Sequence, residues 1–219
     1  MTTTIPQEAF SEILKELERL PIAMNKYRNK AGEGRSQTFG IVGRRCLPPD
    51  ASRMNWLRPY LYHLLLEFGK KYVPFSFTSI TVNQNYQASP HYDKNNKGVS
   101  FLVGFGDYTE GHLKIHEGDL KGSHDINCKP IIADFSKILH EVEAFQGQRY
   151  SLVFYNFENK KSVVLPKFDV KEEGGKWFFY RDNQKITAKE GLPHPLRNRK
   201  KNENTMIQSA PISFTVSFD

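Results

Sequence analysis

Six short runs of β-forming residues fill the middle of the chain and constrain its fold most strongly. They are FSFTSITVNQNY (75–86), GVSFLVGFG (98–106), GHLKIHEG (111–118), KPIIADF (129–135), ILHEVEAF (138–145) and RYSLVFYNF (149–157). Short runs rich in Val, Ile, Phe and Tyr and bounded by Gly, Pro, Asn or Asp are typical of strands. Six of them in succession indicate an antiparallel sandwich or barrel.

Helices are expected before this β region. Apolar residues recur at helical spacing over residues 6–20, and Pro6 stands near the first turn, where a missing N–H costs least. The run RSQTFGIVGRRC (35–46) predicts a strand or hairpin, and PPDAS introduces a second amphipathic helix that reaches Phe68. The fold class predicted is therefore mainly β with flanking helices.

The chain after the β region carries weaker signals. KWFFYRDNQKIT (176–187) predicts a small hairpin that turns at Arg181 to Asn183, HPLRNRKKNEN (194–204) a solvated basic loop, and PISFTVSF (211–218) a closing strand. A length of 219 residues suits one domain. We expect residues 1–158 to form that domain, with a β core at about 75–158, and residues 159–219 to be an extension packed on it.

Composition narrows the location and the partners. The sequence has no long apolar run, so we expect no association with a membrane, and it predicts no particular protein partner. Cys46 and Cys128 are too few for a disulfide framework, which favours a reducing intracellular compartment, nuclear or cytoplasmic. The net charge of +7 favours a polyanionic partner such as nucleic acid, because bound Lys and Arg release counterions from phosphates.

Three residues have the chemistry of a metal site. His91 and Asp93 stand two apart just after a predicted strand, so both side chains point to the same side of an extended chain. His140 supplies a third ligand from a later strand. Two imidazoles and one carboxylate on one face of a metal are the arrangement of non-haem Fe(II) oxygenases. The alternative is an H-x-D sequence in a surface loop with no metal.

Arg149 follows His140 by nine residues. We expect a two-stranded hairpin, with its turn near Gln146 to Gln148, to bring both side chains into the same interior. The planar guanidinium of Arg149 suits a carboxylate bidentately, so it could hold a dicarboxylic acid whose other end chelates the metal. The alternative is a core arginine paired with Asp or Glu.

The string HEVEAFQGQRYSLVFY (140–155) resembles the end of the prolyl hydroxylase type of Fe(II)- and 2-oxoglutarate-dependent dioxygenases. This resemblance covers residues 75–158 and implies a double-stranded β-helix (jelly-roll) core. It implies that His91, Asp93 and His140 hold Fe(II), that O₂ takes an open position, and that Arg149 holds the distal carboxylate of 2-oxoglutarate. It also implies contacts to this cosubstrate from Ser151, Asn83 and Tyr86.

Five phrases, RSQTFGIVGRR, FTSITVNQN, PHYDKNNKG, FLVGFGDYTEGHLKIHEG and FQGQRYSLVFYN, are together similar to the TET/JBP-like oxygenases. This similarity implies oxidation of the 5-methyl group of 5-methylcytosine or thymine in DNA, with Asn96 beside the target base. A turn residue is the alternative role for Asn96. The chain departs from many relatives at Glu110-Gly111-His112-Leu113, where they have two glycines before the leucine, and it lacks a cysteine-rich module. The rival functions are a peptidyl prolyl or lysyl hydroxylase and an inactive binding module of the same fold.

Overall fold

The computed structural model describes residues 4–22, 32–44, 47–158 and 167–187. The helical elements are η1 (Gln7–Phe10), α1 (Ser11–Arg19), α2 (Met54–Leu57) and α3 (Pro59–Tyr72). The strands of the main body are β1 (Gly32–Arg44), β2 (Leu47–Ala51), β3 (Ser79–Ala88), β4 (Asn96–Glu110), β5 (Leu113–Ile115), β6 (Gly122–His124), β7 (Ile131–Ala133), β8 (His140–Val142) and β9 (Phe145–Phe157). Strands β10 (Phe168–Glu173), β11 (Lys176–Arg181) and β12 (Gln184–Ile186) follow.

Two antiparallel sheets form the main body. The larger has the strand order β2-β1-β3-β9-β4-β7, and the smaller has the order β6-β5-β8. Apolar side chains fill the space between them, among them Leu102 and Val153 from the larger sheet and Leu113 and Ile115 from the smaller. The predicted mainly β class with flanking helices and a jelly-roll core is confirmed, and each of the six predicted strand runs contains a strand.

Alternation along β9 sorts its side chains between two environments. Leu152 and Phe154 belong to the core under the helices, whereas Val153 and Tyr155 belong to the core that faces the smaller sheet. Successive side chains of a strand point to opposite faces, so Arg149 and Ser151 lie on the same face as Val153. This periodicity places both polar residues inside the jelly roll.

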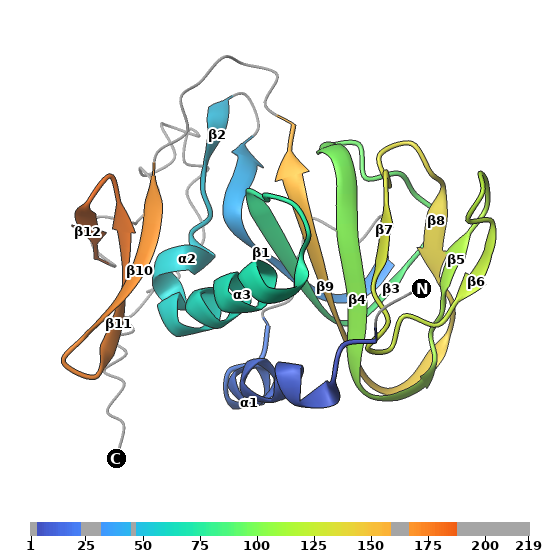
Figure 1. The fold of residues 1–219 in the computed structure, drawn as a ribbon, viewed down its shortest axis with the longest axis horizontal. Helices are drawn as coiled ribbons and strands as arrows, with labels where there is room; N and C mark the ends of the chain where they lie inside the picture. The colour runs from blue at the N-terminus through green and yellow to red at the C-terminus, as the bar shows by residue number, and fades with distance from the viewer. Residues whose placement is uncertain (1–3, 23–31, 45–46, 159–166, 188–219) are drawn as a thin grey trace, which may run out of the picture.

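The helices cover the other face of the larger sheet (Figure 1). Leu17 of α1 and Leu65 of α3 are completely buried in the core that they share with Val82 and Phe154. The second helix that the sequence predicts is divided into α2 and α3. The division falls at Pro59, which opens α3 and has no N–H with which to continue the preceding helical ladder.

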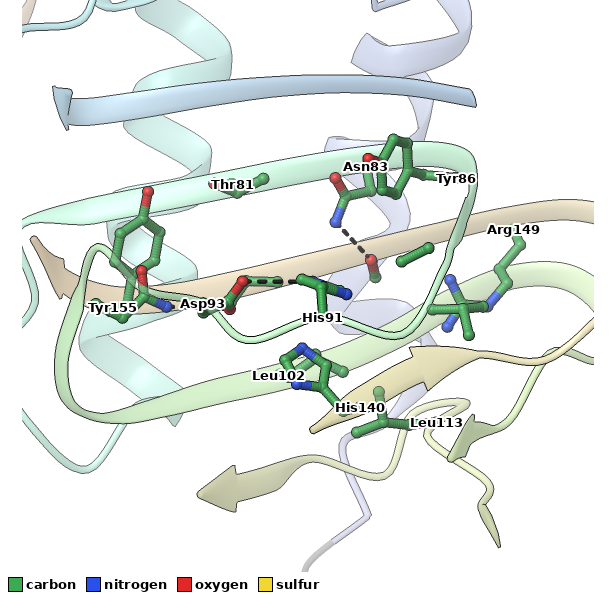
Figure 2. A pocket seen from close by; sticks show the side chains of 15 residues that line it. Thr81, Asn83, Tyr86, His91, Asp93, Leu102, Leu113, His140, Arg149 and Tyr155 are labelled. Atoms are coloured by element: carbon green, nitrogen blue, oxygen red, sulfur yellow. Dashed lines mark hydrogen bonds and ion pairs between the residues drawn. The ribbon is translucent and has the colours of Figure 1, made fainter. Parts of the chain in front are cut away.

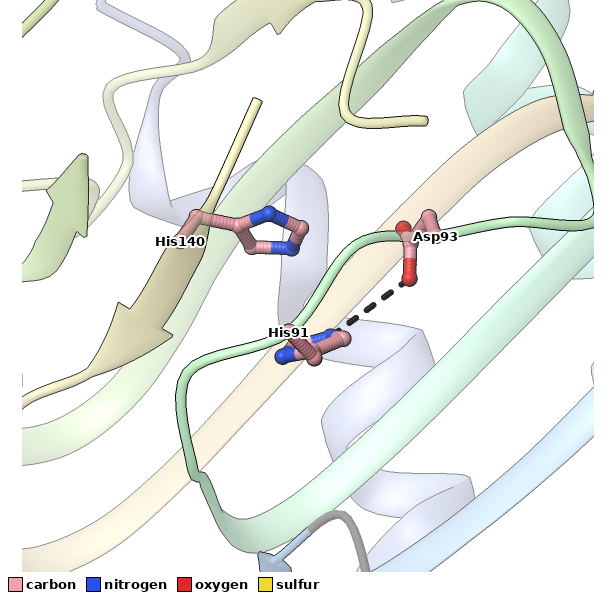
Figure 3. Close-up of side chains that lie close together, drawn as sticks. All are labelled: His91, Asp93 and His140. Carbon is pink, nitrogen blue, oxygen red and sulfur yellow. Dashed lines mark ion pairs between the residues drawn. The ribbon is translucent and has the colours of Figure 1, made fainter. Parts of the chain in front are cut away.

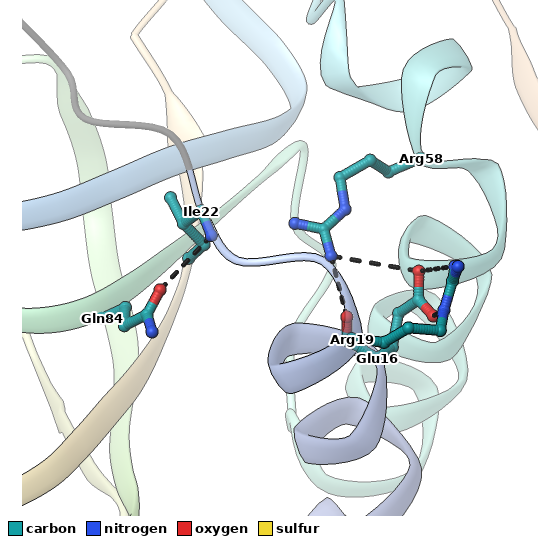
Figure 4. Close-up of polar contacts among 5 residues, drawn as sticks. All are labelled: Glu16, Arg19, Ile22, Arg58 and Gln84. Carbon is teal, nitrogen blue, oxygen red and sulfur yellow. Dashed lines mark hydrogen bonds and ion pairs between the residues drawn. The ribbon is translucent and has the colours of Figure 1, made fainter. Parts of the chain in front are cut away.

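A buried arginine joins α1 to the start of α3 (Figure 4). Arg58 is only 6% exposed, and its Nη2 donates a hydrogen bond of 3.1 Å to the carbonyl oxygen of Glu16. The carboxylate of Glu16 lies 3.9 Å from the same nitrogen and is also bound by Arg19. Burial lowers the pKa of Arg58 to about 10, so Glu16 compensates a charge that has lost much of its solvation.

Strands β10 to β12 form a third sheet that packs on α2 and α3. Phe179 is 1% exposed and lies 6.2 Å, ring centroid to ring centroid, from Tyr62, while Trp177 stacks on His63 at 4.2 Å. The expected turn joins β11 to β12 through Asp182 and Asn183, both with positive φ, whereas β10 was not predicted. The predicted basic loop and closing strand lie outside the described residues, and the division at residue 158 stays a prediction.

The hairpin expected between His140 and Arg149 is wrong. Strand β8, which carries His140, pairs with β5 in the smaller sheet, whereas β9 pairs with β3 and β4 in the larger one. Residues Gln146 to Gln148 lie within β9 rather than in a turn. The chain crosses from one sheet to the other here, so the two side chains meet across the interior rather than along a hairpin.

Candidate metal centre and cosubstrate pocket

A backbone bridge brings the two histidines of the predicted triad together. His91 and His140 form an isolated antiparallel pair, in which the N–H of each donates to the carbonyl of the other at 2.9 and 3.1 Å. Their rings are 4.3 Å apart, centroid to centroid. The loop after β3 is therefore fixed to β8, although 49 positions separate the two residues in the sequence.

Asp93 completes the cluster (Figure 3). One ligand atom from each of His91, Asp93 and His140 lies within 4.8 Å of the others, and this is the one such cluster found in the described part of the chain. The Nε2 of His91 is 3.5 Å from Oδ1 of Asp93. The backbone N–H of Asp93 donates to the carbonyl of Phe135 at 2.9 Å, which fixes the direction of its side chain.

The tautomers of both imidazoles suit metal binding. Nδ1 of His91 lies 2.8 Å from the carbonyl of Ser89, and Nδ1 of His140 lies 2.9 Å from that of Ile138. A carbonyl can only accept, so each Nδ1 carries a proton, and in the neutral ring the lone pair that binds a metal is then on Nε2. Burial also lowers the pKa of His140, which favours the neutral ring. Two nitrogens and one carboxylate oxygen fit Fe(II).

Asn96 supports the carboxylate of this cluster. Its side-chain nitrogen donates hydrogen bonds of 3.1 Å to Oδ2 of Asp93 and to Oγ of Ser100. The two oxygens of Asp93 are thereby distinguished, because Oδ2 is bound to Asn96 and Oδ1 faces His91. The predicted contact of Asn96 with a substrate base remains a prediction, but its amide protons already have partners within the protein.

Arg149 lies at one end of a pocket that the histidines and Asp93 also line (Figure 2). It is only 1% exposed, and in the part of the chain that the structure describes no Asp or Glu forms an ion pair with it. Its Nε donates to the carbonyl of Gly111 at 3.1 Å. The alternative of a core arginine paired with a carboxylate therefore finds no support, and the guanidinium keeps donors for a ligand.

The other predicted cosubstrate residues line the same pocket. Ser151 lies two residues after Arg149 on β9, on the same face of the strand. Its Oγ accepts a hydrogen bond of 3.1 Å from Nδ2 of Asn83 on the neighbouring strand β3. Oδ1 of Asn83 is buried and has no partner among the described residues. Tyr86 also lines the pocket and is 7% exposed. A polar ligand beside Arg149 would thus meet several polar side chains.

Two residues around Arg149 were missed in the sequence. The guanidinium lies 5.4 Å from the centroid of the Tyr108 ring. Gly111 has a φ of +64°, and a Cβ there would come within 3.0 Å of Cδ and Nε of Arg149. The E-G-H-L sequence carried a signal for this, since a glycine after β4 allows a close approach of the backbone.

A wider groove opens beside the metal cluster. It shares Tyr86, His91, Asp93, Asn96 and Tyr155 with the pocket and continues to the end of β1. Three other histidines lie outside the cluster. His112 and His116 pair with Glu143 and Glu141, and the ring of His124 contacts the carbonyl of Leu120. Within the described ranges no helix is long and apolar enough to cross a membrane.

Comparisons with known proteins agree with the fold. No family model matches the sequence, and no curated protein matches it either. Among solved structures, NgTET1 in complex with 5mC DNA matches with a TM-score of 0.51 at 15% identity, over 74% of this chain and 72% of that one. An oxidoreductase of the 2OG-Fe(II) oxygenase family from Burkholderia pseudomallei matches with a TM-score of 0.50 at 17% identity, over 69% and 82%.

A prolyl-4-hydroxylase from Pseudomonas putida has a TM-score of 0.46 at 13% identity, over 74% of this chain and 91% of that one. The resemblance seen in the sequence is thus confirmed at the level of fold, and the chain shares the jelly-roll architecture of solved 2OG-Fe(II) oxygenases.

Proposed function

We propose that this chain is an Fe(II)- and 2-oxoglutarate-dependent dioxygenase that oxidises the 5-methyl group of 5-methylcytosine or thymine in DNA. The observation that carries the oxygenase part is the pairing, in one pocket, of a His-Asp-His cluster with a buried arginine that has no carboxylate partner among the described residues. The His-Asp-His cluster alone would imply only a metal, and the buried arginine alone would imply only an anion.

The roles of the residues follow from their positions. His91, Asp93 and His140 would hold Fe(II), and Arg149 with Ser151 would bind the far carboxylate of 2-oxoglutarate, with Asn83 and Tyr86 beside it. Iron, 2-oxoglutarate and O₂ together supply an oxidant for unactivated C–H bonds. The contribution of the protein is to orient these groups and to exclude water with the apolar side chains of Leu102, Leu113 and Val153.

The DNA part of the proposal rests on three supports. They are the five sequence phrases similar to TET/JBP-like oxygenases, the net charge of +7, and the fold shared with NgTET1, whose structure contains 5mC DNA. A base in a duplex would have to leave the stack to reach a pocket of this kind. An intracellular location, nuclear or cytoplasmic, fits such a substrate and stays a prediction.

The test is anaerobic reconstitution with Fe(II) and 2-oxoglutarate, followed by exposure to air with different substrates. We expect succinate release that DNA containing 5-methylcytosine or thymine stimulates, and an oxidised nucleoside in the digested DNA by mass spectrometry. Stimulation by proline- or lysine-containing peptides alone would identify a peptidyl hydroxylase. Failure to bind iron would identify an inactive binding module. Asp93→Ala should abolish the product.

A further inference from the structure

The groove beside the metal cluster has features that the proposed chemistry does not use. It runs between the end of β1, the loop 91–96 and the end of β9. Its charged residues outside the metal cluster are Arg44 and Lys94, both basic, and both side chains reach solvent. Its only carboxylate in the described part of the chain is that of Asp93, which faces His91. The groove is therefore electropositive apart from the metal ligand.

Aromatic and apolar side chains also line the groove. They include Phe157, Tyr155 and Val42, and the ring of Tyr92, another lining residue, is 37% exposed. The ring of Phe157 lies directly on the backbone of Gly43, because a Cβ at residue 43 would come within 2.6 Å of Cζ of Phe157. A planar, weakly polar group could pack on this surface on its way to the metal.

Arg44 retains charge in spite of its ion pair. Its Nη2 lies 3.0 Å from Oδ2 of Asp50, and Nη1 of Arg181 lies 3.0 Å from Oδ1 of the same carboxylate. One carboxylate thus neutralises two guanidinium groups only in part. Arg44 is 43% exposed, so it can still approach an anion at the groove, and Asp50 holds its side chain in place.

We propose that this groove binds a nucleic-acid strand, with Arg44 and Lys94 contacting the backbone phosphates on either side of the nucleotide whose base packs over Phe157 and Tyr92. The inference rests on the proposed function and names the residues through which the DNA would be held. A groove lined by aromatic rings and two basic side chains fits a nucleobase flanked by phosphates, whereas a neutral proline-containing peptide offers the two cations no anionic group.

The test is fluorescence anisotropy with a labelled single-stranded oligodeoxynucleotide that contains one central 5-methylcytosine. The variant is the pair Arg44→Gln and Lys94→Gln, and the matched control is Lys15→Gln with Lys70→Gln, which removes the same charge from exposed sites on α1 and α3. We expect the groove variant to bind about tenfold more weakly, with the slope of log K against log salt reduced by about 0.7 for each lost phosphate contact.

Further variants and ligands distinguish failure of the groove assignment from failure of the proposed function. The conservative pair Arg44→Lys and Lys94→Arg should restore most of the binding. If DNA binds and is oxidised but the groove variant behaves like the control, the groove assignment is overturned and the proposed function stands. If wild-type protein neither binds nor oxidises the oligonucleotide, both proposals fail. Binding of a polyglutamate peptide as strongly as the oligonucleotide would also overturn the groove assignment.

Discussion

The carbonyl oxygen of Gly111 accepts a hydrogen bond from Nε of Arg149 at 3.1 Å, and the missing side chain of Gly111 leaves the space that this arginine occupies. Two distant parts of the chain therefore form the Arg149 end of the pocket together. The turn after β4 fixes the position of the guanidinium, while the charge comes from β9.

Replacing Gly111 by Ala should weaken 2-oxoglutarate binding by about tenfold, because the new Cβ would meet Cβ of Phe145 at 2.8 Å and Cδ and Nε of Arg149 at 3.0 Å, so that the arginine has to shift. Calorimetric titration of 2-oxoglutarate into the Mn(II)-loaded protein measures this. Gly118→Ala is the matched control, since Gly118 also has a positive φ, of +76°, but a Cβ there meets nothing within 4 Å. Equal affinities in the two variants would show that Gly111 does not position Arg149.

Replacing His140 by Ala should abolish the thermal stabilisation that Fe(II) or Mn(II) gives, because one of three ligands is lost. A metal that binds only the folded protein raises stability by about 2.7 kcal/mol at a concentration of 100 Kd, so its loss is measurable as a lower Tm. His112→Ala serves as the control, since His112 pairs with Glu143 outside the cluster. A full metal-dependent shift in His140→Ala would disprove the ligand assignment.

Asn96→Ala should reduce metal affinity by about tenfold, because supports of metal ligands contribute on this scale. The physical cause is the loss of the hydrogen bond that fixes Oδ2 of Asp93. Competition with a metal-sensitive dye measures the change, and the exposed neighbour Asn95→Ala is the control. Unchanged metal affinity with a raised KM for DNA would instead favour the base-contacting role predicted from the sequence.

Phe179→Ala should lower the free energy of unfolding of the whole protein by about 3 kcal/mol, the usual effect of removing a large core side chain. Phe179 is buried against Tyr62 of α3, whereas its neighbour Phe178 is partly exposed and supplies the control Phe178→Ala. Urea denaturation should give one transition that moves to lower concentration. A separate early transition, with the main one unmoved, would mean that residues 167–187 fold independently.

Glu16→Ala should lower the free energy of unfolding by about 2 to 3 kcal/mol, because it leaves Arg58 buried without its anionic neighbour. The same substitution at Glu12, whose pair with Lys15 is exposed, should change it by less than about 0.5 kcal/mol. The two variants lie on the same helix, so thermal and urea denaturation compare a buried with an exposed ion pair directly. Similar losses in both would contradict the role given to Arg58.

The fold class and the candidate residues of the site could both be predicted from the sequence. The nearly continuous apolar runs in 98–106 and 149–157 indicate strands that are buried on both faces, and in an extended chain the two side chains of His-x-Asp point the same way. Local patterns carry this information because they depend only on neighbouring residues.

Which strands are neighbours could not be predicted from the sequence and is known from the folded structure. The separation of nine residues between His140 and Arg149 is compatible with a hairpin, yet β8 and β9 lie in different sheets because the chain closes a jelly roll there. The contacts of Arg149 with Gly111 and Tyr108 and of Asn96 with Asp93, together with the basic groove from Arg44 to Lys94, arise from this arrangement. Strand pairing is a long-range choice, set by which faces bury the most apolar surface, and short sequence patterns do not encode it.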